Sequence, residues 1–120
     1  MNIKSLVLIA ALSLPGFAGA SSRHDAELAL TQAQGALDAA ERAGAAEYAM
    51  PDLTTARGGM ANAAGLAERR EWTDSMLASE RTTADANLAE ARSRQARAEA
   101  ATQEVEDAVR TLRAELGTGG

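Results

Sequence analysis

The fold is decided by residues 74–115, which read DSMLASERTTADANLAEARSRQARAEAATQEVEDAVRTLRAE and contain neither proline nor glycine. Those two residue types are the strongest helix breakers, whereas alanine, the best helix former, recurs throughout the stretch. Thr73 precedes it and is a good N-cap residue, so the sequence predicts one uninterrupted helix that ends near Leu116. At 1.5 Å per residue, such a helix spans roughly 60 Å.

A shorter helix is predicted over about residues 24–43. Ser21 or Ser22 is expected to cap its start, and Gly44 supplies a C-terminal stop. Its apolar side chains recur at spacings of three and four, which predicts one buried face. The residues of that face are Ala26, Leu30, Ala33, Leu37 and Ala40.

A loop at 44–50 leads to a second short helix opened by Pro51, whose missing N–H costs nothing in a first turn. Its predicted buried stripe is Leu53, Ala56, Met60, Ala64 and Ala67. Gly58-Gly59 interrupts good helix formers, and each glycine costs roughly 1 kcal/mol relative to alanine. We interpret the pair as a soft spot in preference to a site of close backbone approach.

Two helices of about 20 residues can cover only half of a helix twice as long. The sequence therefore predicts an all-α fold: an antiparallel helical hairpin packed on a long third helix, that is, a three-helix bundle with a coiled-coil extension. The extension carries a heptad, Leu88, Gln95, Thr102, Val109 and Leu116 at one core position and Ala91, Ala98, Val105 and Leu112 at the other.

The last part of this heptad, Val105, Val109, Leu112 and Leu116, is apolar enough to need a cover. A second copy of the chain, another envelope protein, or a bend that folds the helix back on itself would each supply one. We favour self-association through the third helix.

Residues 1–20 have the three parts of an export signal. Lys4 gives a positive start, Leu6–Leu14 is a short apolar run, and Ala18-Gly19-Ala20 is a peptidase site, so we predict cleavage after Ala20 and a periplasmic location. A retained N-terminal anchor is the alternative. Ser21 rather than Cys follows the predicted cleavage point, so no lipid anchor is expected.

We predict a single helical domain over 21–116 and a flexible tail at 117–120.

Composition narrows the classes of partner. Residues 21–120 include 26 alanines but no Cys, Lys, Ile or Phe, and their 11 arginines against 17 acidic residues give a net charge of −6. Nucleic-acid binding relies on clustered positive charge, so no nucleic-acid partner is expected. The lack of cysteine excludes disulfides and thiolate metal sites, and no further apolar run predicts membrane insertion after cleavage.

No set of residues predicts catalysis, cofactor binding or a metal site. His24 is the only histidine, and Ser75, Ser79 and Thr82 have no general base nearby in sequence. Two groups of charges are interpreted as solvated or salt-bridged surface in preference to a calcium site or a site for an anionic polymer. They are the acidic cluster Glu104, Glu106 and Asp107 and the basic run Arg92, Arg94 and Arg97.

Tyr48 and Trp72 fall in the two predicted connections, at opposite ends of the bundle. Each is expected to cap a thin alanine core. The alternative is a binding surface, with Tyr48, Met50 or Trp72 contacting an envelope polymer or a client protein.

The loop AGAAEYAMPDL at 43–53, followed by Ala56-Arg57, resembles the signature of the domain-of-unknown-function family 4398. The run ADANLAEAR at 84–92 is similar to that family's second block, and together the two blocks span roughly residues 36–100. The resemblance implies a helical domain of a bacterial envelope protein, often lipid-anchored or followed by a peptidoglycan-binding domain, neither of which is expected here. The function expected is that of a non-enzymatic exported envelope protein, a structural or protein-interaction module.

Overall fold

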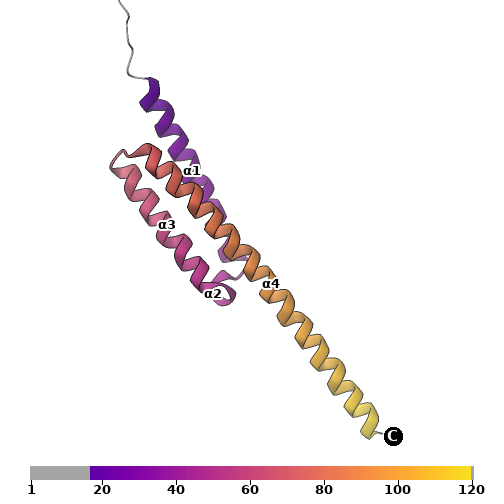
Figure 1. The fold of residues 1–120 in the computed structure, drawn as a ribbon. Coiled ribbons are helices and arrows are strands. Elements are labelled where there is room, and N and C mark those ends of the chain that lie inside the picture. The colour runs from indigo at the N-terminus through magenta and orange to yellow at the C-terminus, as the bar shows by residue number, and fades with distance from the viewer. Residues whose placement is uncertain (1–16, 120) are drawn as a thin grey trace, which may run out of the picture.

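The computed structural model describes residues 17–119, and every element in that range is a helix. The elements are α1 (Phe17–Arg42), the single turn α2 (Ala45–Tyr48), α3 (Met50–Glu68) and α4 (Trp72–Thr118). In Figure 1, α1 and α3 run antiparallel, and α4 lies along both and then continues alone. The predicted all-α fold, with a hairpin packed on a long last helix, is confirmed.

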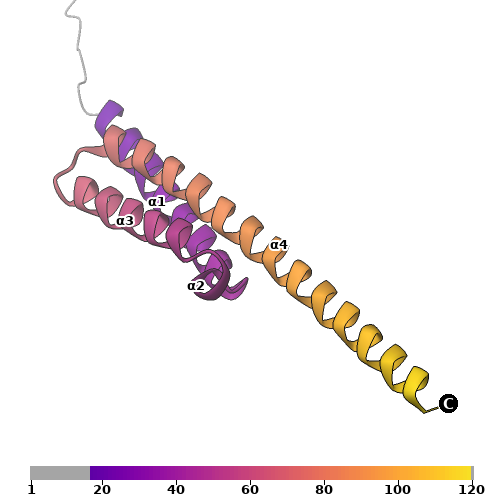
Figure 2. The ribbon, with the colours of Figure 1, turned by 60° about the horizontal axis from the view of Figure 1, so that its bottom comes forward.

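Helix α4 does not fold back. Figure 2 shows the same straight path beyond α2 from a second direction, which excludes the bend considered as a cover for the C-terminal heptad. Among the three long helices, α4 packs most extensively. Its contact with α1 is the largest, its contact with α3 is somewhat smaller, and α1 and α3 contact each other least. The long helix is therefore the common support of the hairpin.

Several predicted helix ends are wrong by a few residues. Helix α1 begins at Phe17, so Ser21 and Ser22 lie inside it and do not cap it. Helix α4 begins at Trp72 with Glu71 in the N-cap position, so Thr73 is not the cap, and it ends at Thr118 rather than Leu116. Residues 1–16, which hold most of the predicted export signal, lie outside the described part of the chain.

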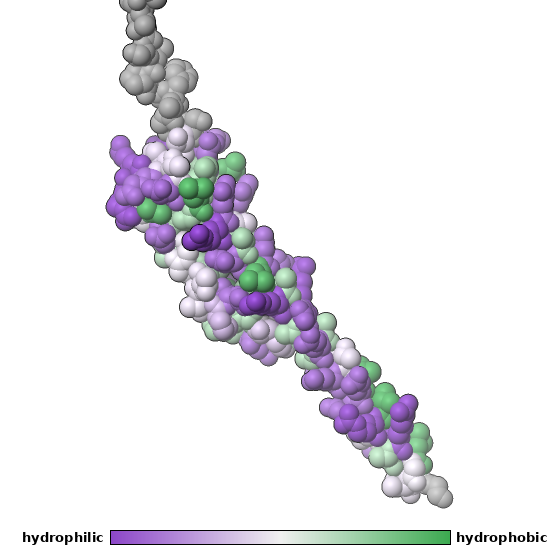
Figure 3. Space-filling model, viewed as in Figure 1, coloured by the Kyte–Doolittle hydropathy of each residue, from purple (hydrophilic) through white to green (hydrophobic). Residues whose placement is uncertain are grey.

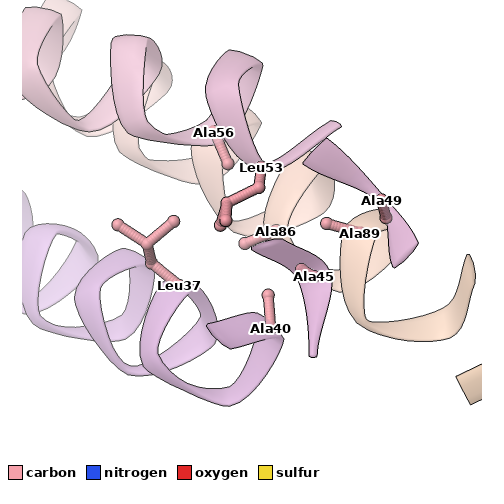
Figure 4. Close-up of a cluster of buried hydrophobic side chains, with 8 residues drawn as sticks. All are labelled: Leu37, Ala40, Ala45, Ala49, Leu53, Ala56, Ala86 and Ala89. Carbon is pink, nitrogen blue, oxygen red and sulfur yellow. The ribbon is translucent and has the colours of Figure 1, made fainter. Parts of the chain in front are cut away.

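The interior is made almost entirely of small side chains. The buried face of α1 matches four of its five predicted positions, but Ala29 takes the place of Leu30, which is only half-buried. In α3 the fully buried residues are Leu53, Ala56 and Ala63. The predicted Met60, Ala64 and Ala67 are partly exposed, because the face of α3 that packs inward includes Ala56, Gly59 and Ala63 instead. Figure 4 shows Leu37 and Leu53 as the only large side chains among the alanines of the central cluster.

The buried face of α4 was not predicted from the sequence. It alternates spacings of four and three and consists of Ser75, Ser79, Thr82, Ala86, Ala89 and Ser93. Three of the four hydroxyls donate to the carbonyl four residues earlier in their own helix, as Ser79 Oγ does to Ser75 O at 2.8 Å. Ser75 Oγ instead donates across to Ala63 O of α3, also at 2.8 Å. With its hydroxyl satisfied in this way, a serine packs almost as a small apolar residue.

Gly59 allows α3 and α4 to approach closely. A Cβ built on Gly59 would lie 2.5 Å from Thr82 Oγ1, whereas one on Gly58 would meet nothing within 4 Å. The interpretation of the pair as a soft spot is therefore wrong for Gly59, where the missing side chain makes room for Thr82. Sequence spacing alone did not show which of the two glycines faces α4.

The two turns are built differently. Gly44 ends α1 with φ of 92°, a left-handed conformation that glycine adopts without strain. The turn from α3 to α4 has Arg70 in that conformation, with φ of 61°. The N–H groups of Arg70 and Glu71 donate to Ala67 O and Leu66 O, which is the hydrogen-bond pattern of a Schellman motif. These bonds fix the direction in which α4 leaves the hairpin.

Candidate interaction surface

The C-terminal part of α4 has no partner within the described chain. Ser93 is its last buried residue, and every residue from Ala101 to Gly119 is exposed. Beyond Ser93, Arg97 still contacts the hairpin, because its Nη1 donates to Ala43 O at 3.4 Å. We call residues 98–118 the arm.

All the exposed large apolar side chains of α4 fall on one stripe. They are Leu77, Leu88, Val105, Val109, Leu112 and Leu116. Their positions fit a single heptad that runs from residue 77 to residue 116, and the intervening stripe positions are exposed as well. The sequence predicted this stripe from Leu88 onward. Continuing the same spacing backward from Leu88 by steps of four, three and four residues, through Ala84 and Arg81, would have found Leu77 too.

The stripe lies on the side of α4 that faces away from the hairpin. Within the bundle, each stripe residue from 77 to 95 follows a buried one by two positions, as Leu77 follows Ser75 and Leu88 follows Ala86. Two residues correspond to a rotation of roughly 200° about a helix axis. The bundle therefore leaves the stripe open along the whole of α4, and Figure 3 shows apolar side chains along one edge of the arm, beside hydrophilic ones.

Charge is segregated along the same helix. The basic run Arg92, Arg94 and Arg97 is followed by the acidic cluster Glu104, Glu106 and Asp107. Arg92 pairs with Asp52 of α3 at 2.6 Å and Arg94 with Glu90 at 2.5 Å, but their side chains stay 58% and 72% exposed. Each guanidinium therefore keeps donors that face water.

In the acidic cluster, Asp107 pairs with Arg110 at 3.0 Å. Glu104 and Glu106 make no salt bridge within the described residues. The basic and acidic groups thus lie next to each other along the helix, at the level where the arm leaves the bundle.

The other predicted interaction residues are not brought together. Tyr48 and Met50 lie where α2 meets α3 and are 37% and 45% exposed, with the Tyr48 ring close to Gly44. Trp72 lies at the opposite end of the bundle, half-buried, with the Arg23 guanidinium 5.7 Å from its ring centre (Figure 1). The separation predicted from the sequence is confirmed, and it means that these side chains do not form one site.

The groups considered for chemistry are dispersed in the described residues. His24 is exposed, and no three His, Cys, Asp or Glu side chains between residues 17 and 119 are placed to hold a metal ion. No helix of the described part is both long enough and apolar enough to cross a bilayer. An open hollow between α3 and α4, beside Gly59, Asn62 and Leu77, borders the N-terminal end of the stripe.

Comparison of the chain with protein-family models, with curated proteins and with solved structures found no match in any of the three. The resemblance of residues 43–53 and 84–92 to family 4398 therefore stays a prediction from those residues alone.

Proposed function

We propose that the chain is a non-enzymatic, exported helical protein of the bacterial cell envelope that acts as an interaction module and self-associates through the stripe of α4. One observation carries the proposal. Six large apolar side chains lie in a continuous heptad on the open side of a single helix.

Large apolar side chains that face water in a monomer are exposed at a cost, and covering each leucine-sized side chain contributes about 1.5–3 kcal/mol. Four of the six follow one another in the arm, at Val105, Val109, Leu112 and Leu116. The repeat of four and three residues is the repeat by which two helices pack side chains between one another. The surface therefore matches another helix in length and in spacing.

The non-enzymatic part of the proposal is supported by how the hydroxyls are used. Ser75, Ser79 and Thr82 are fully buried, and each donates to a backbone carbonyl. A nucleophile needs an exposed oxygen next to a general base. Export and envelope location are supported by the leader-like residues 1–20 and by the family resemblance.

The alternative, a binding site made from the interhelical loops, has less support. Its aromatic residues Tyr48 and Trp72 lie at opposite ends of the bundle, and Trp72 is partly covered by Arg23. No single ligand-sized surface includes both.

The substitution Leu112→Asp tests the proposal because it places a charge in the stripe at a residue that is 57% exposed. We expect wild-type protein to form an oligomer and the variant to be monomeric, with the helical circular dichroism of the bundle kept. Thr111→Asp is the matched control, since it adds the same charge one residue away on the same exposed helix but off the stripe. Sedimentation equilibrium gives the masses. A wild type that stays monomeric as its concentration is raised, or an oligomer that Leu112→Asp leaves intact, would contradict the proposal.

A further inference from the structure

We infer that two copies of the chain pair antiparallel through α4, about a two-fold axis near Ala100, so that the arm of each copy lies along the bundle of the other. The inference rests on the proposed self-association and adds its direction and register. Three features of α4 carry it: the order of its charges, the composition of the stripe, and the openness of the stripe over the bundle.

The basic run of α4 lies on one side of Ala100, and the acidic cluster lies at a similar distance on the other side. In an antiparallel pair with its axis there, residues whose numbers add up to about 200 face each other. Arg94 then lies directly opposite Glu106 of the second copy, and Arg92 and Arg97 each lie one position away from a carboxylate, those of Asp107 and Glu104. Two-fold symmetry makes this contact twice. A parallel pair in register would instead set the basic run beside its own copy and the acidic cluster beside its own, and like charges repel.

The stripe fits the same register. Antiparallel helices pack each position of one heptad class against the other class, which happens only when the residue numbers of facing pairs add up to 200 or differ from it by a multiple of seven. At 200, Leu88 meets Leu112 of the second copy, and Val109 and Leu116 of one copy meet Ala91 and Ala84 of the other. Two of the five distinct layers thus combine a large apolar side chain with alanine, which suits interdigitation. The two layers nearest the axis set Gln95 against Val105 and Ala98 against Thr102.

The neighbouring registers fit less well. If facing numbers add up to 207, Arg94 and Arg97 would face Arg113 and Arg110, and only Arg92 would face a carboxylate, that of Glu115. If they add up to 193, with the same allowance of one position, only Arg94 meets a carboxylate, that of Glu99. Charge therefore selects one register among those that the stripe permits.

The bundle leaves room for this contact. Ala84, Leu88 and Ala91 are exposed although the opposite side of α4 is buried against α1 and α3. The facing segments, residues 84–116 of each copy, are about 50 Å long. A strip about 10 Å wide gives on the order of 1,000 Å² buried in total, near the lower limit of specific interfaces. The pairing is thus expected to depend on protein concentration.

Because the chain contains no cysteine, single cysteines can report the direction of pairing. We compare Leu88→Cys alone, Leu112→Cys alone, and an equal mixture of the two under mild oxidation, with non-reducing electrophoresis as the readout. The antiparallel register predicts a disulfide-linked dimer in the mixture and little in either variant alone. A disulfide needs Cα atoms about 4.4–6.8 Å apart, which only directly facing positions provide. A mixture of Leu88→Cys with Thr111→Cys, whose second cysteine lies off the stripe, is the matched control.

The outcomes separate the two proposals. Efficient linkage of Leu112→Cys with itself would overturn the inference in favour of a parallel pair. A wild type that is dimeric by sedimentation but gives no link in the mixture would overturn the register while leaving self-association intact. A wild type that is monomeric throughout would overturn the self-association itself, and with it the inference.

Discussion

The two halves of α4 use the same helix in opposite ways. Up to Ser93, its inward face is made of serine, threonine and alanine and is buried, while Leu77 and Leu88 point outward. From Ala101 to Gly119 every residue is exposed, and the apolar residues of the stripe there are valines and leucines, which are larger than the residues of the inward face. In the described chain, the only large apolar side chains classed as buried are Leu37 and Leu53, and many more are exposed. The comparison teaches that this fold is built on close approach of small residues, and that its bulkier apolar surface faces outward.

The largest expected contrast is between a leucine of the bundle and one of the arm. Leu53→Ala removes a side chain with no exposed surface, and such a truncation lowers the free energy of unfolding by about 2–5 kcal/mol. Leu112→Ala, in the arm, should leave the free energy of unfolding of the monomer nearly unchanged. Urea unfolding followed by circular dichroism, at concentrations low enough to avoid association, measures both. Equal losses in the two variants would contradict the division of α4 into a packed half and a free half.

The two adjacent glycines of α3 sharpen the account of the packed half. Gly58→Ala meets open space and should raise the free energy of unfolding by about 1 kcal/mol through helix propensity. Gly59→Ala forces Thr82 to move, and overpacking of this kind costs typically 1–3 kcal/mol, so the net change should be zero or negative. Thermal unfolding of both variants shows whether each substitution raises or lowers the stability.

Combining Gly59→Ala with Thr82→Ala supplies the control for this prediction, since it removes the atom with which the new Cβ collides. The double variant should have a higher free energy of unfolding than Thr82→Ala alone, because the gain in helix propensity at residue 59 then comes without the collision. If Gly59→Ala proves as stabilising as Gly58→Ala, the close approach of α3 and α4 at this point is wrong.

The smallest expected effect separates two buried serines. Ser75→Ala removes the hydrogen bond that joins α4 to Ala63 of α3 and should cost about 1 kcal/mol. Ser79→Ala removes only a bond within α4, and the higher helix propensity of alanine offsets much of that loss. Chemical denaturation of the two variants, analysed as a pair, measures the difference; identical stabilities would mean that the bond between the helices contributes little.

Much of the fold follows from local sequence features. Gly44 and Pro51 mark the end of one helix and the start of the next, and both act as predicted. The long stretch without proline or glycine forms one helix that outreaches its neighbours, which is why the arm exists. The start of α4 was not predictable, since Glu71, at its N-cap, is not a preferred capping residue and helix ends depend on neighbouring turns.

Part of the candidate interaction surface was also predictable from local sequence features. The heptad from Leu88 to Leu116 is a periodic pattern, and such a pattern can be recognised in the sequence without knowing which elements pack around the helix. The placement of Tyr48 and Trp72 at opposite ends followed from the order of helices and connections. The extension of the stripe to Leu77 was missed because the heptad was not continued backward past Leu88, through Ala84 and Arg81.

Local sequence features were enough to locate the three long helices and give their approximate lengths, because helix propensity, helix breakers and periodicity act over a few residues. The single turn α2 fell within the predicted loop at 44–50. The tertiary structure decided which face of α4 turns inward. A face of Ser75, Ser79, Thr82 and alanines has less apolar surface than the stripe on the other side, so hydropathy alone favours the wrong one. The small face goes inside because backbone carbonyls satisfy its hydroxyls, and because α1 and the Gly59 surface of α3 can approach only a helix without bulk.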